Sequence, residues 1–165
     1  MRAIDVRDLL ESPGSAKTVE VDEAVPGLHT ELAEVPEGTH IAGVLTLESV
    51  VEGIYVTGSV AGRMTFRCAR CLKGFERDFD VEMHELFVRD PGPDDDYVLR
   101  PERSLDPEPM VRDAVVLAMP FSPLCRPDCL GLCERCGGDR NLGECTCTEP
   151  VDPRWAALER FSERS

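Results

Sequence analysis

The sequence is organised around residues 54–87, which read IYVTGSVAGRMTFRCARCLKGFERDFDVEMHELF. Apolar and polar residues alternate before the two cysteines of this segment, and the alternation resumes after them. A period of two is typical of strands that bury one face, and two such runs joined by a short glycine-containing link predict an antiparallel β-hairpin. The expected apolar face comprises Ile54, Val56, Val60, Met64, Phe66 and Cys68 from the first run, and Phe75, Phe79, Val81, Met83 and Phe87 from the second.

Two glycines, Gly58 and Gly62, fall on the apolar face of the first run. Glycine inside a strand often marks a bulge or a bend, because it has no side chain to pack against its neighbours. We therefore expect a curved strand with bulges or bends at these two positions.

Weaker signals precede the hairpin. Leu45 and Leu47 alternate with polar residues and predict another strand. Residues 1–40 carry only the pattern of a helical turn over residues 4–10 and a short alternation that begins at Val19.

A helix is predicted after a loop over residues 90–109 that is rich in Pro and Asp. Asp106 suits the N-cap because its carboxylate accepts a hydrogen bond from a free N–H group, and Pro107 suits the first helical position. Apolar residues then recur at helical spacing, which predicts an amphipathic helix over residues 107–118 that packs on the sheet. Its apolar face comprises Met110, Val111, Ala114, Val115 and Ala118.

These elements predict an α+β fold, in which a curved antiparallel sheet is covered by one helix and followed by a zinc-stabilised tail. A chain of 165 residues is long enough for one ordinary domain with a small appendage. We expect the core over residues 1–120 and the cysteine-rich tail over residues 121–165. An Asp152-Pro153 cap predicts a short helix at the end of the tail, with Trp155, Leu158 and Phe161 near one side.

Composition favours a cytosolic protein without a membrane span. No apolar run approaches the roughly 18 residues that a transmembrane helix needs, and residues 1–5 lack a signal-peptide hydrophobic stretch. The formal net charge is −14 at pH 7. A surface this acidic repels phosphate and favours basic partners, which disfavours wrapping of nucleic acid around the whole molecule.

The chain contains 8 cysteines. In a reducing cytosol, thiols in such number indicate metal ligands or redox groups rather than disulfides. Their spacing is Cys68-x2-Cys71 and then, after 53 residues, Cys125-x3-Cys129-x3-Cys133-x2-Cys136-x8-Cys145-x-Cys147. The x2 spacing lets two sulfurs face one tetrahedral ion. Because the tail is poor in aliphatic residues, we expect zinc binding, one or two ions per chain, to supply its folding free energy.

Two partitions of the cysteines are compatible with this spacing. In one, Cys133, Cys136, Cys145 and Cys147 bind one ion, and Cys68 and Cys71 join Cys125 and Cys129 around another. In the other, one zinc lies in the tail, and Cys68 and Cys71 form a free dithiol. Inert thiols are a further alternative, and the spacing matches no iron–sulfur run. A thioredoxin-type pair opens a helix, whereas a strand is predicted after Cys71, which disfavours redox catalysis.

Basic residues gather around the first cysteine pair: Arg63, Arg67, Arg70, Lys73 and Arg77. Arg63, Arg67 and, through the turn, Arg77 are expected on the strand face opposite the apolar one. Guanidinium groups there can bind RNA phosphate or a partner. The alternative is a solvated face whose arginines pair with Asp78, Asp80 and Glu82 across the hairpin.

Signals for catalysis are absent from the sequence. His29, His40 and His84 lie beside no obvious nucleophile, and His84 is expected to point outward from its strand. No phosphate-binding Gly-Lys-Ser/Thr loop and no dinucleotide fingerprint occur. The acidic run Asp94–Asp96 is typical of a solvated loop. We therefore expect no enzyme and no small-molecule substrate.

Several motifs in the same order resemble those of the YceD family, the large ribosomal RNA subunit accumulation proteins. They are Cys68-Ala69-Arg70-Cys71-Leu72 with Phe75, Leu117-Ala118-Met119-Pro120, Leu124-Cys125, Gly131-Leu132-Cys133-Glu134-Arg135-Cys136-Gly137, Asn141-Leu142, and Val151-Asp152-Pro153-Arg154-Trp155. The resemblance covers nearly the whole chain, most distinctively residues 54–75 and 110–160. The family's hallmark cysteine pair falls on Cys68 and Cys71, whereas not every branch carries the cysteine-rich tail.

The resemblance implies a cytosolic bacterial protein that supports production or stability of 23S ribosomal RNA, linked to a large-subunit ribosomal protein. Our first hypothesis is a non-catalytic factor for large-subunit assembly that binds ribosomal protein, 23S rRNA or both. The second is a thiol redox or metal-handling protein that uses Cys68 and Cys71. A third, a zinc-ribbon transcription regulator, requires a basic DNA-binding surface and is disfavoured by the negative charge.

Overall fold

The computed structural model describes residues 1–147 as a mostly antiparallel β-protein with few helices, consistent with an α+β fold. The elements are β1 (Ile4–Asp5), α1 (Arg7–Leu10), β2 (Ala16–Ala24), β3 (Ala33–Glu34), β4 (His40–Ser49), β5 (Gly53–Arg67), β6 (Gly74–Val88), β7 (Ser104–Leu105), α2 (Glu108–Ala118) and a 3₁₀ turn over Arg140–Leu142. The expected terminal helix with Trp155, Leu158 and Phe161 lies outside these residues. No helix within residues 1–147 is long and apolar enough to cross a membrane.

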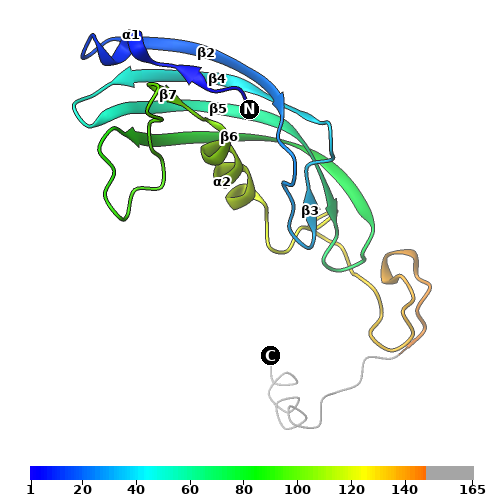
Figure 1. Ribbon diagram of the computed structural model, residues 1–165. Coiled ribbons are helices and arrows are strands. Elements are labelled where there is room, and N and C mark those ends of the chain that lie inside the picture. The colour runs from blue at the N-terminus through cyan, green and yellow to red at the C-terminus, as the bar shows by residue number, and fades with distance from the viewer. Residues whose placement is uncertain (148–165) are drawn as a thin grey trace, which may run out of the picture.

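The predicted hairpin is confirmed as the pair β5–β6. The two strands pair along their full length, from Gly53 opposite Val88 to Arg67 opposite Gly74. The strands follow one another across the sheet in the order β2, β4, β5, β6, and the short β3 pairs with β5 beyond the end of β4. Figure 1 shows that this sheet curves strongly along its strands and that α2 lies on the inner side of the curve.

The expected curvature of the strand is present (Figure 1), but neither Gly58 nor Gly62 forms a bulge. The register of β5 runs through both glycines without interruption, toward β6 and, at Gly58, also toward β4. Gly62 lies opposite Phe79, and a Cβ atom there would come within 2.9 Å of two ring carbons. The glycine therefore makes room for an aromatic ring on the inner face, and the strand curves with its ladder intact.

The core lies between the inner face of the sheet and α2. Met110, Val111 and Val115 of α2 are fully buried against the strands. Asp106 caps the first turn, because the Glu108 N–H donates to Asp106 Oδ1 at 3.1 Å, although the helix begins at Glu108, one residue later than predicted. The predicted apolar face of the helix was wrong at its last residue. Ala118 is exposed, and Met119, just past the helix, is buried instead.

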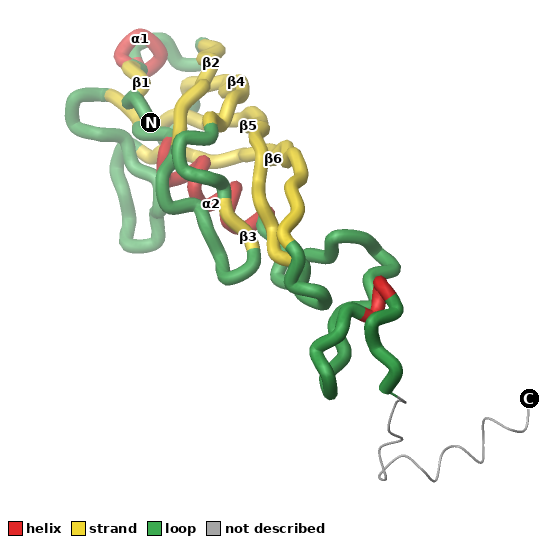
Figure 2. The backbone as a smooth tube through the Cα atoms, turned by 90° about the vertical axis from the view of Figure 1, so that its right-hand side faces the viewer, coloured by secondary structure: helices red, strands yellow, loops and turns green. Residues whose placement is uncertain are grey.

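The outer face of the sheet is not covered by any described helix. On β6, the outer-face residues are polar and exposed, and they alternate with inner-face residues. They are Glu76, Asp78, Asp80, Glu82 and His84. His84 is thus exposed on its strand, as expected. Beyond the tip of the hairpin, the segment up to residue 147 extends away from the sheet (Figures 1 and 2).

Candidate metal centre

Two thiols are positioned by the turn that joins β5 to β6. The Cys68 N–H donates to the Lys73 carbonyl at 2.9 Å, and the Leu72 N–H donates to the Cys68 carbonyl, also at 2.9 Å. These bonds close a tight loop in which Cys68 and Cys71 lie side by side and are both buried. The regular ladder of the hairpin therefore delivers the cysteine pair to one fixed place at its tip.

The segment after α2 adds two more thiols at the same place. The Ala69 N–H donates to the Pro123 carbonyl at 2.8 Å, which holds this segment against the hairpin tip. The sulfur atoms of Cys68, Cys71, Cys125 and Cys129, here called the hairpin group, all lie within 4.8 Å of one another. This arrangement corresponds to the first of the two partitions described above.

The sulfur–sulfur distances in the hairpin group fit a metal site. Cys68 Sγ lies 3.8 Å from Cys129 Sγ, and Cys71 Sγ lies 3.7 Å from Cys125 Sγ. A disulfide would bring two sulfurs to about 2.05 Å. Four thiolates at about 2.3 Å around a tetrahedral zinc ion are separated by about 3.8 Å. The hairpin group can therefore hold such an ion with little movement.

The surroundings of the hairpin group favour the thiolate form of Cys68 over that of Cys125. Burial alone would raise the pKa of Cys68, but N–H groups of Cys125, Cys71 and Arg70 bond to its sulfur and lower the pKa to about 6. Burial and the neighbouring thiols raise the pKa of Cys125 to about 12. A cation placed among the sulfurs would remove this imbalance by favouring the charged form of every thiol.

A second set of four thiols lies in the tail. The sulfurs of Cys133, Cys136, Cys145 and Cys147, here called the tail group, also lie within 4.8 Å of one another. Its first pair repeats the hairpin turn: the Cys133 N–H donates to the Gly138 carbonyl at 2.9 Å and the Gly137 N–H donates to the Cys133 carbonyl at 2.8 Å. The N–H groups of Cys136 and Arg135 lower the pKa of Cys133 to about 6. Unlike the hairpin group, this group has two exposed members, Cys136 and Cys147.

Two polar residues that the sequence analysis did not select connect the groups. Asp139 is buried, and its carboxylate lies 2.7 Å from the Lys73 ammonium group at the hairpin tip. The Asn141 amide donates to Cys129 Sγ at 3.6 Å, and its oxygen accepts the Leu130 N–H at 2.8 Å. Asn141 stood in a family motif, but nothing in the residue pattern marked Asp139, which follows two glycines in a polar segment.

The basic cluster Arg63, Arg67, Arg70, Lys73 and Arg77 is largely engaged within the protein. Arg63 Nε donates to Asp78 at 3.0 Å across the hairpin, as the alternative interpretation expects for this residue. Arg70 donates to the Cys129 carbonyl at 2.8 Å, so it supports the hairpin group directly.

The prediction that Arg77 shares a face with Arg63 was wrong. Arg77 lies opposite Met64, which is buried on the inner face, and directly paired residues project to the same side. Its guanidinium group lies 4.9 Å from the centre of the Phe75 ring and donates to the Leu124 carbonyl at 2.6 Å. Arg77 therefore helps to pack the segment of Cys125 onto the hairpin.

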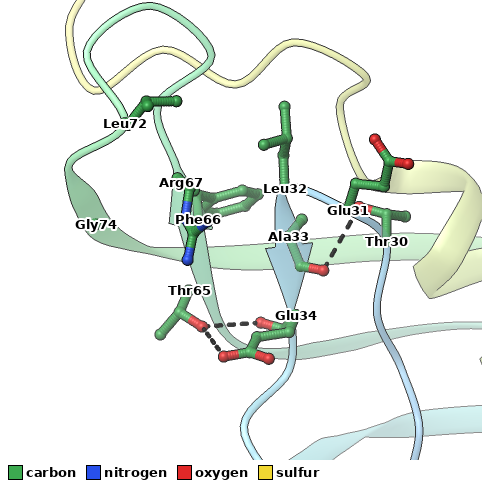
Figure 3. A pocket seen from close by; sticks show the side chains of 10 residues that line it. All are labelled: Thr30, Glu31, Leu32, Ala33, Glu34, Thr65, Phe66, Arg67, Leu72 and Gly74. Carbon is green, nitrogen blue, oxygen red and sulfur yellow. Dashed lines mark hydrogen bonds between the residues drawn. The ribbon is translucent and has the colours of Figure 1, made fainter. Parts of the chain in front are cut away.

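Arg67 differs from the other members of the basic cluster, because none of the described residues binds its side chain. It lies on the rim of a cavity of about 380 Å³ between β3, the end of β5 and the hairpin tip. Figure 3 shows Arg67 and the exposed Leu72 on the tip side of this cavity, and Glu34 bonded to Thr65 on the other. Arg67 is thus the member of the cluster best placed to bind a partner.

The histidines take no part in either thiol group. His29, His40 and His84 are all exposed, and His40 Nδ1 lies 2.8 Å from Asp22 Oδ1 on the outer face of the sheet. Within residues 1–147, the two groups that can hold a metal ion consist of cysteines alone. Four sulfur ligands without an open position are typical of structural rather than catalytic metal sites.

The protein is a small, mostly antiparallel β-protein with two four-cysteine groups. One group lies at the tip of the long β5–β6 hairpin, and the other lies in the tail. Within this class, the chain belongs to the YceD family: the family model described as large ribosomal RNA subunit accumulation protein YceD matches residues 56–162. The resemblance inferred from the motifs is confirmed.

The chain is also similar to individual bacterial proteins. An uncharacterised protein of Mycobacterium tuberculosis is 36% identical over 162 residues, which cover 94% of this chain and 78% of the relative. An uncharacterised protein of Mycobacterium leprae is 30% identical and covers 93% of this chain and 74% of the relative. The uncharacterised protein YlbN of Bacillus subtilis is 29% identical over 62% of this chain and 63% of its own length. No solved structure is significantly similar to the chain.

Proposed function

We propose that this protein is a non-catalytic, zinc-stabilised cytoplasmic factor that supports 23S rRNA accumulation and assembly of the large ribosomal subunit. The observation that carries the proposal is the pair of preformed four-cysteine groups in a chain of the YceD family. The family is named for accumulation of large-subunit ribosomal RNA. With metal bound, the cysteine groups would fix the hairpin tip and the tail, which supplies a physical reason for this fold to present a rigid surface.

Zinc is the metal that the ligand set favours. Tetrahedral sites of four cysteine thiolates bind zinc or iron, and the spacing here matches no iron–sulfur run. The hairpin group would bind one ion and the tail group another. When bound, each ion would serve as a structural link, and each four-thiolate site would carry a net charge of about −2. The occupied protein would therefore be more acidic than its formal charge of −14.

The charge distribution supports a basic ribosomal protein as the main partner. An acidic surface attracts basic chains and repels the rRNA backbone over most of the molecule. Direct contact with rRNA would be confined to the surroundings of the basic cluster. Arg67 is its best candidate, because Arg63, Arg70, Lys73 and Arg77 already bind groups within the protein.

Metal content and cellular partners test the proposal together. The purified full-length protein should contain two zinc ions per chain. Affinity purification from cells at low and at high salt should recover large-subunit ribosomal proteins or precursor 23S rRNA, with rRNA lost first as salt screens its phosphates. Well under one zinc per chain, or recovery of chaperones without ribosomal components, would contradict the proposal.

A role in thiol redox chemistry or metal handling is the second candidate; the sequence analysis placed it at Cys68 and Cys71, whereas exposure favours the tail group. The exposed Cys136 and Cys147 favour it, since an accessible site exchanges ions or reacts with oxidants more readily than a buried one. Burial of Cys68 and Cys71 in the turn between two strands supports a structural role for the hairpin group. Reaction of the native protein with a thiol reagent separates the two: zinc-bound thiolates react slowly, whereas a free redox pair reacts at once.

A further inference from the structure

The strand β6 forms one edge of the sheet and pairs with β5 alone (Figure 2). Residues of an antiparallel strand alternately direct their N–H and C=O groups toward one neighbour and the other. At the end of β6, Val88 bonds away from β5: its N–H donates to the Tyr97 carbonyl at 3.0 Å, and its carbonyl accepts the Leu99 N–H at 2.9 Å. The even-numbered residues of β6 therefore direct their backbone groups outward.

These outward groups have no partner along most of β6. Over residues 78–86, no group from the described part of the protein bonds to the outward backbone N–H and C=O groups. At the opposite edge of the sheet, the N-terminal segment bonds to two side chains of β2: Lys17 Nζ donates to the Asp5 carbonyl at 3.0 Å, and the Arg2 N–H donates to Glu23 at 3.1 Å. The backbone edge of β6 over residues 78–86 is thus open.

The side chains along this edge differ sharply between its two faces. On the outer face, Asp80 and Glu82 are exposed, and none of the described basic groups pairs with them. On the inner face, Phe79 and Val81 are only partly buried, because the sheet ends there and leaves one flank of each side chain open. A strand added here would meet carboxylates on one side and apolar surface on the other.

We propose that the edge of β6 over residues 78–86 binds an extended segment of a basic protein as an additional strand, in which basic and apolar residues alternate. Backbone hydrogen bonds would give affinity, and the alternate side chains would give specificity. Basic residues of the segment would face Asp80 and Glu82, and its apolar residues would cover Phe79 and Val81. The inference deepens the proposed function, on which the assignment of the segment to a ribosomal protein depends.

At one end of this edge, loop residues already bond to the outward backbone groups. Residue 98 forms a parallel bridge with Val88, so the loop after β6 occupies the position of the next strand there. An incoming segment would continue this line along the rest of the edge. The geometry of the outward groups therefore suits sheet extension over the open residues as well.

Charge excludes a second copy of this chain as the occupant. Pairing of two β6 edges would place the acidic row of one copy beside that of the other, and like charges on neighbouring strands destabilise a sheet. Charged residues on an edge strand are a common protection against such self-association. The same carboxylates repel RNA, which leaves a basic polypeptide as the ligand of choice.

A synthetic nine-residue peptide of alternating lysine and valine tests the proposal on the full-length, zinc-loaded protein. On binding, amide exchange at Asp80, Glu82 and His84 should slow at least tenfold, because their outward N–H groups gain acceptors. Exchange at Phe79, Val81 and Met83 should change little, since these residues already bond to β5. A peptide with the same composition but contiguous lysines is the control for non-specific attraction to an acidic protein.

Charge reversal supplies a second, independent measurement. The double substitution Asp80→Lys with Glu82→Lys should weaken peptide binding at least tenfold. The matched control, Glu20→Lys with Glu48→Lys, makes the same change in net charge on the outer face of β2 and β4 and should alter binding less than about twofold, because salt screens charges beyond about 8 Å. Unchanged zinc content of both variants shows that the fold is kept.

The outcomes distinguish failure of the edge proposal from failure of the proposed function. Protection that spreads over other strands, or equal binding of the contiguous-lysine peptide, would overturn the edge as the binding site. In cells, ribosomal proteins recovered with the wild type but lost with Asp80→Lys/Glu82→Lys would support it. If both forms recover them equally, the edge proposal fails while the proposed function stands. If the wild type recovers none, the proposed function fails, and the peptide result still decides whether the edge binds a strand.

Discussion

Leu72 and Gly137 occupy equivalent positions, each one residue after the second cysteine of its turn. Both have a positive φ, 61° and 72° respectively. Glycine adopts this region freely, whereas a residue with a Cβ atom pays about 1–2 kcal/mol. The shared hydrogen bonds show that the thiol turn imposes the backbone conformation, and Leu72 adopts it while the residue is 56% exposed.

Replacement of Leu72 by glycine is expected to stabilise the protein. Relief of the left-handed strain gains about 1–2 kcal/mol, and the greater freedom of glycine in the unfolded chain costs about 0.5–1 kcal/mol. Leu72→Gly should therefore raise the free energy of unfolding by about 0.5–1 kcal/mol, measured by urea denaturation of the zinc-loaded protein. Leu72→Ala keeps the strained backbone and should show no gain. A loss of stability in Leu72→Gly would mean that contacts of the leucine side chain outweigh the strain.

Acid release of the proposed zinc ions would follow from the thiolates at the two turns. Backbone N–H groups lower the pKa of Cys133 to about 6 and, against the effect of burial, that of Cys68 also to about 6, both from an ordinary value of 9.0. A pKa lowered by folding adds stability that is present above the unfolded value and lost as the pH falls through 6. Zinc should therefore stay bound at neutral pH and transfer to a chromophoric chelator as the pH drops below about 6. Half-release above pH 8 would contradict this role of the N–H groups.

Among the elements, the β5–β6 hairpin was the most predictable, because its alternation extends over two long strands and a glycine-containing turn. The strand β2 has buried Val21 but exposed or half-exposed neighbours, so its short alternation carried little signal. The two-residue β3 exists only because it pairs with Thr65 and Phe66 of β5. Long-range pairing of this kind leaves no periodicity in the sequence.

The cap of α2 can be tested at a single position. Asp106 accepts the Glu108 N–H and also pairs with Arg100. Asp106→Ala removes the acceptor and should lower the free energy of unfolding by about 1 kcal/mol. Asp106→Asn keeps a capping oxygen and should lose only a few tenths of that amount, since the pair with Arg100 is partly exposed. Thermal denaturation followed by circular dichroism compares the variants. Equal losses in both would show that the charge, and not the cap, stabilises the helix.

For the whole molecule, the sequence predicted which residues form the thiol groups better than it predicted how these residues are grouped in space. Eight cysteines and their x2 spacings pointed to four-thiol groups, but both partitions fitted the spacing. The choice depends on the path of the chain after α2, which brings Pro123 to Ala69 and so carries Cys125 and Cys129 to the hairpin tip. Contacts such as the Lys73–Asp139 pair join segments 66 residues apart and could not be read from local pattern.

Removal of the two proposed metal ions should proceed in two phases, because the two groups differ in exposure and in their relation to the core. Cys68 and Cys129 are fully buried, whereas Cys136 and Cys147 are exposed, and no described residue after 129 belongs to the apolar core. A chelator should take the first ion from the tail group while the far-ultraviolet circular dichroism of the sheet stays constant. The second ion should leave more slowly, and its loss should speed amide exchange at the ends of β5 and β6. A variant with Cys136→Ser and Cys147→Ser should bind one ion and show the slow phase alone. Release of both ions in a single phase would mean that the groups form one cooperative unit through Asn141 and the Lys73–Asp139 pair.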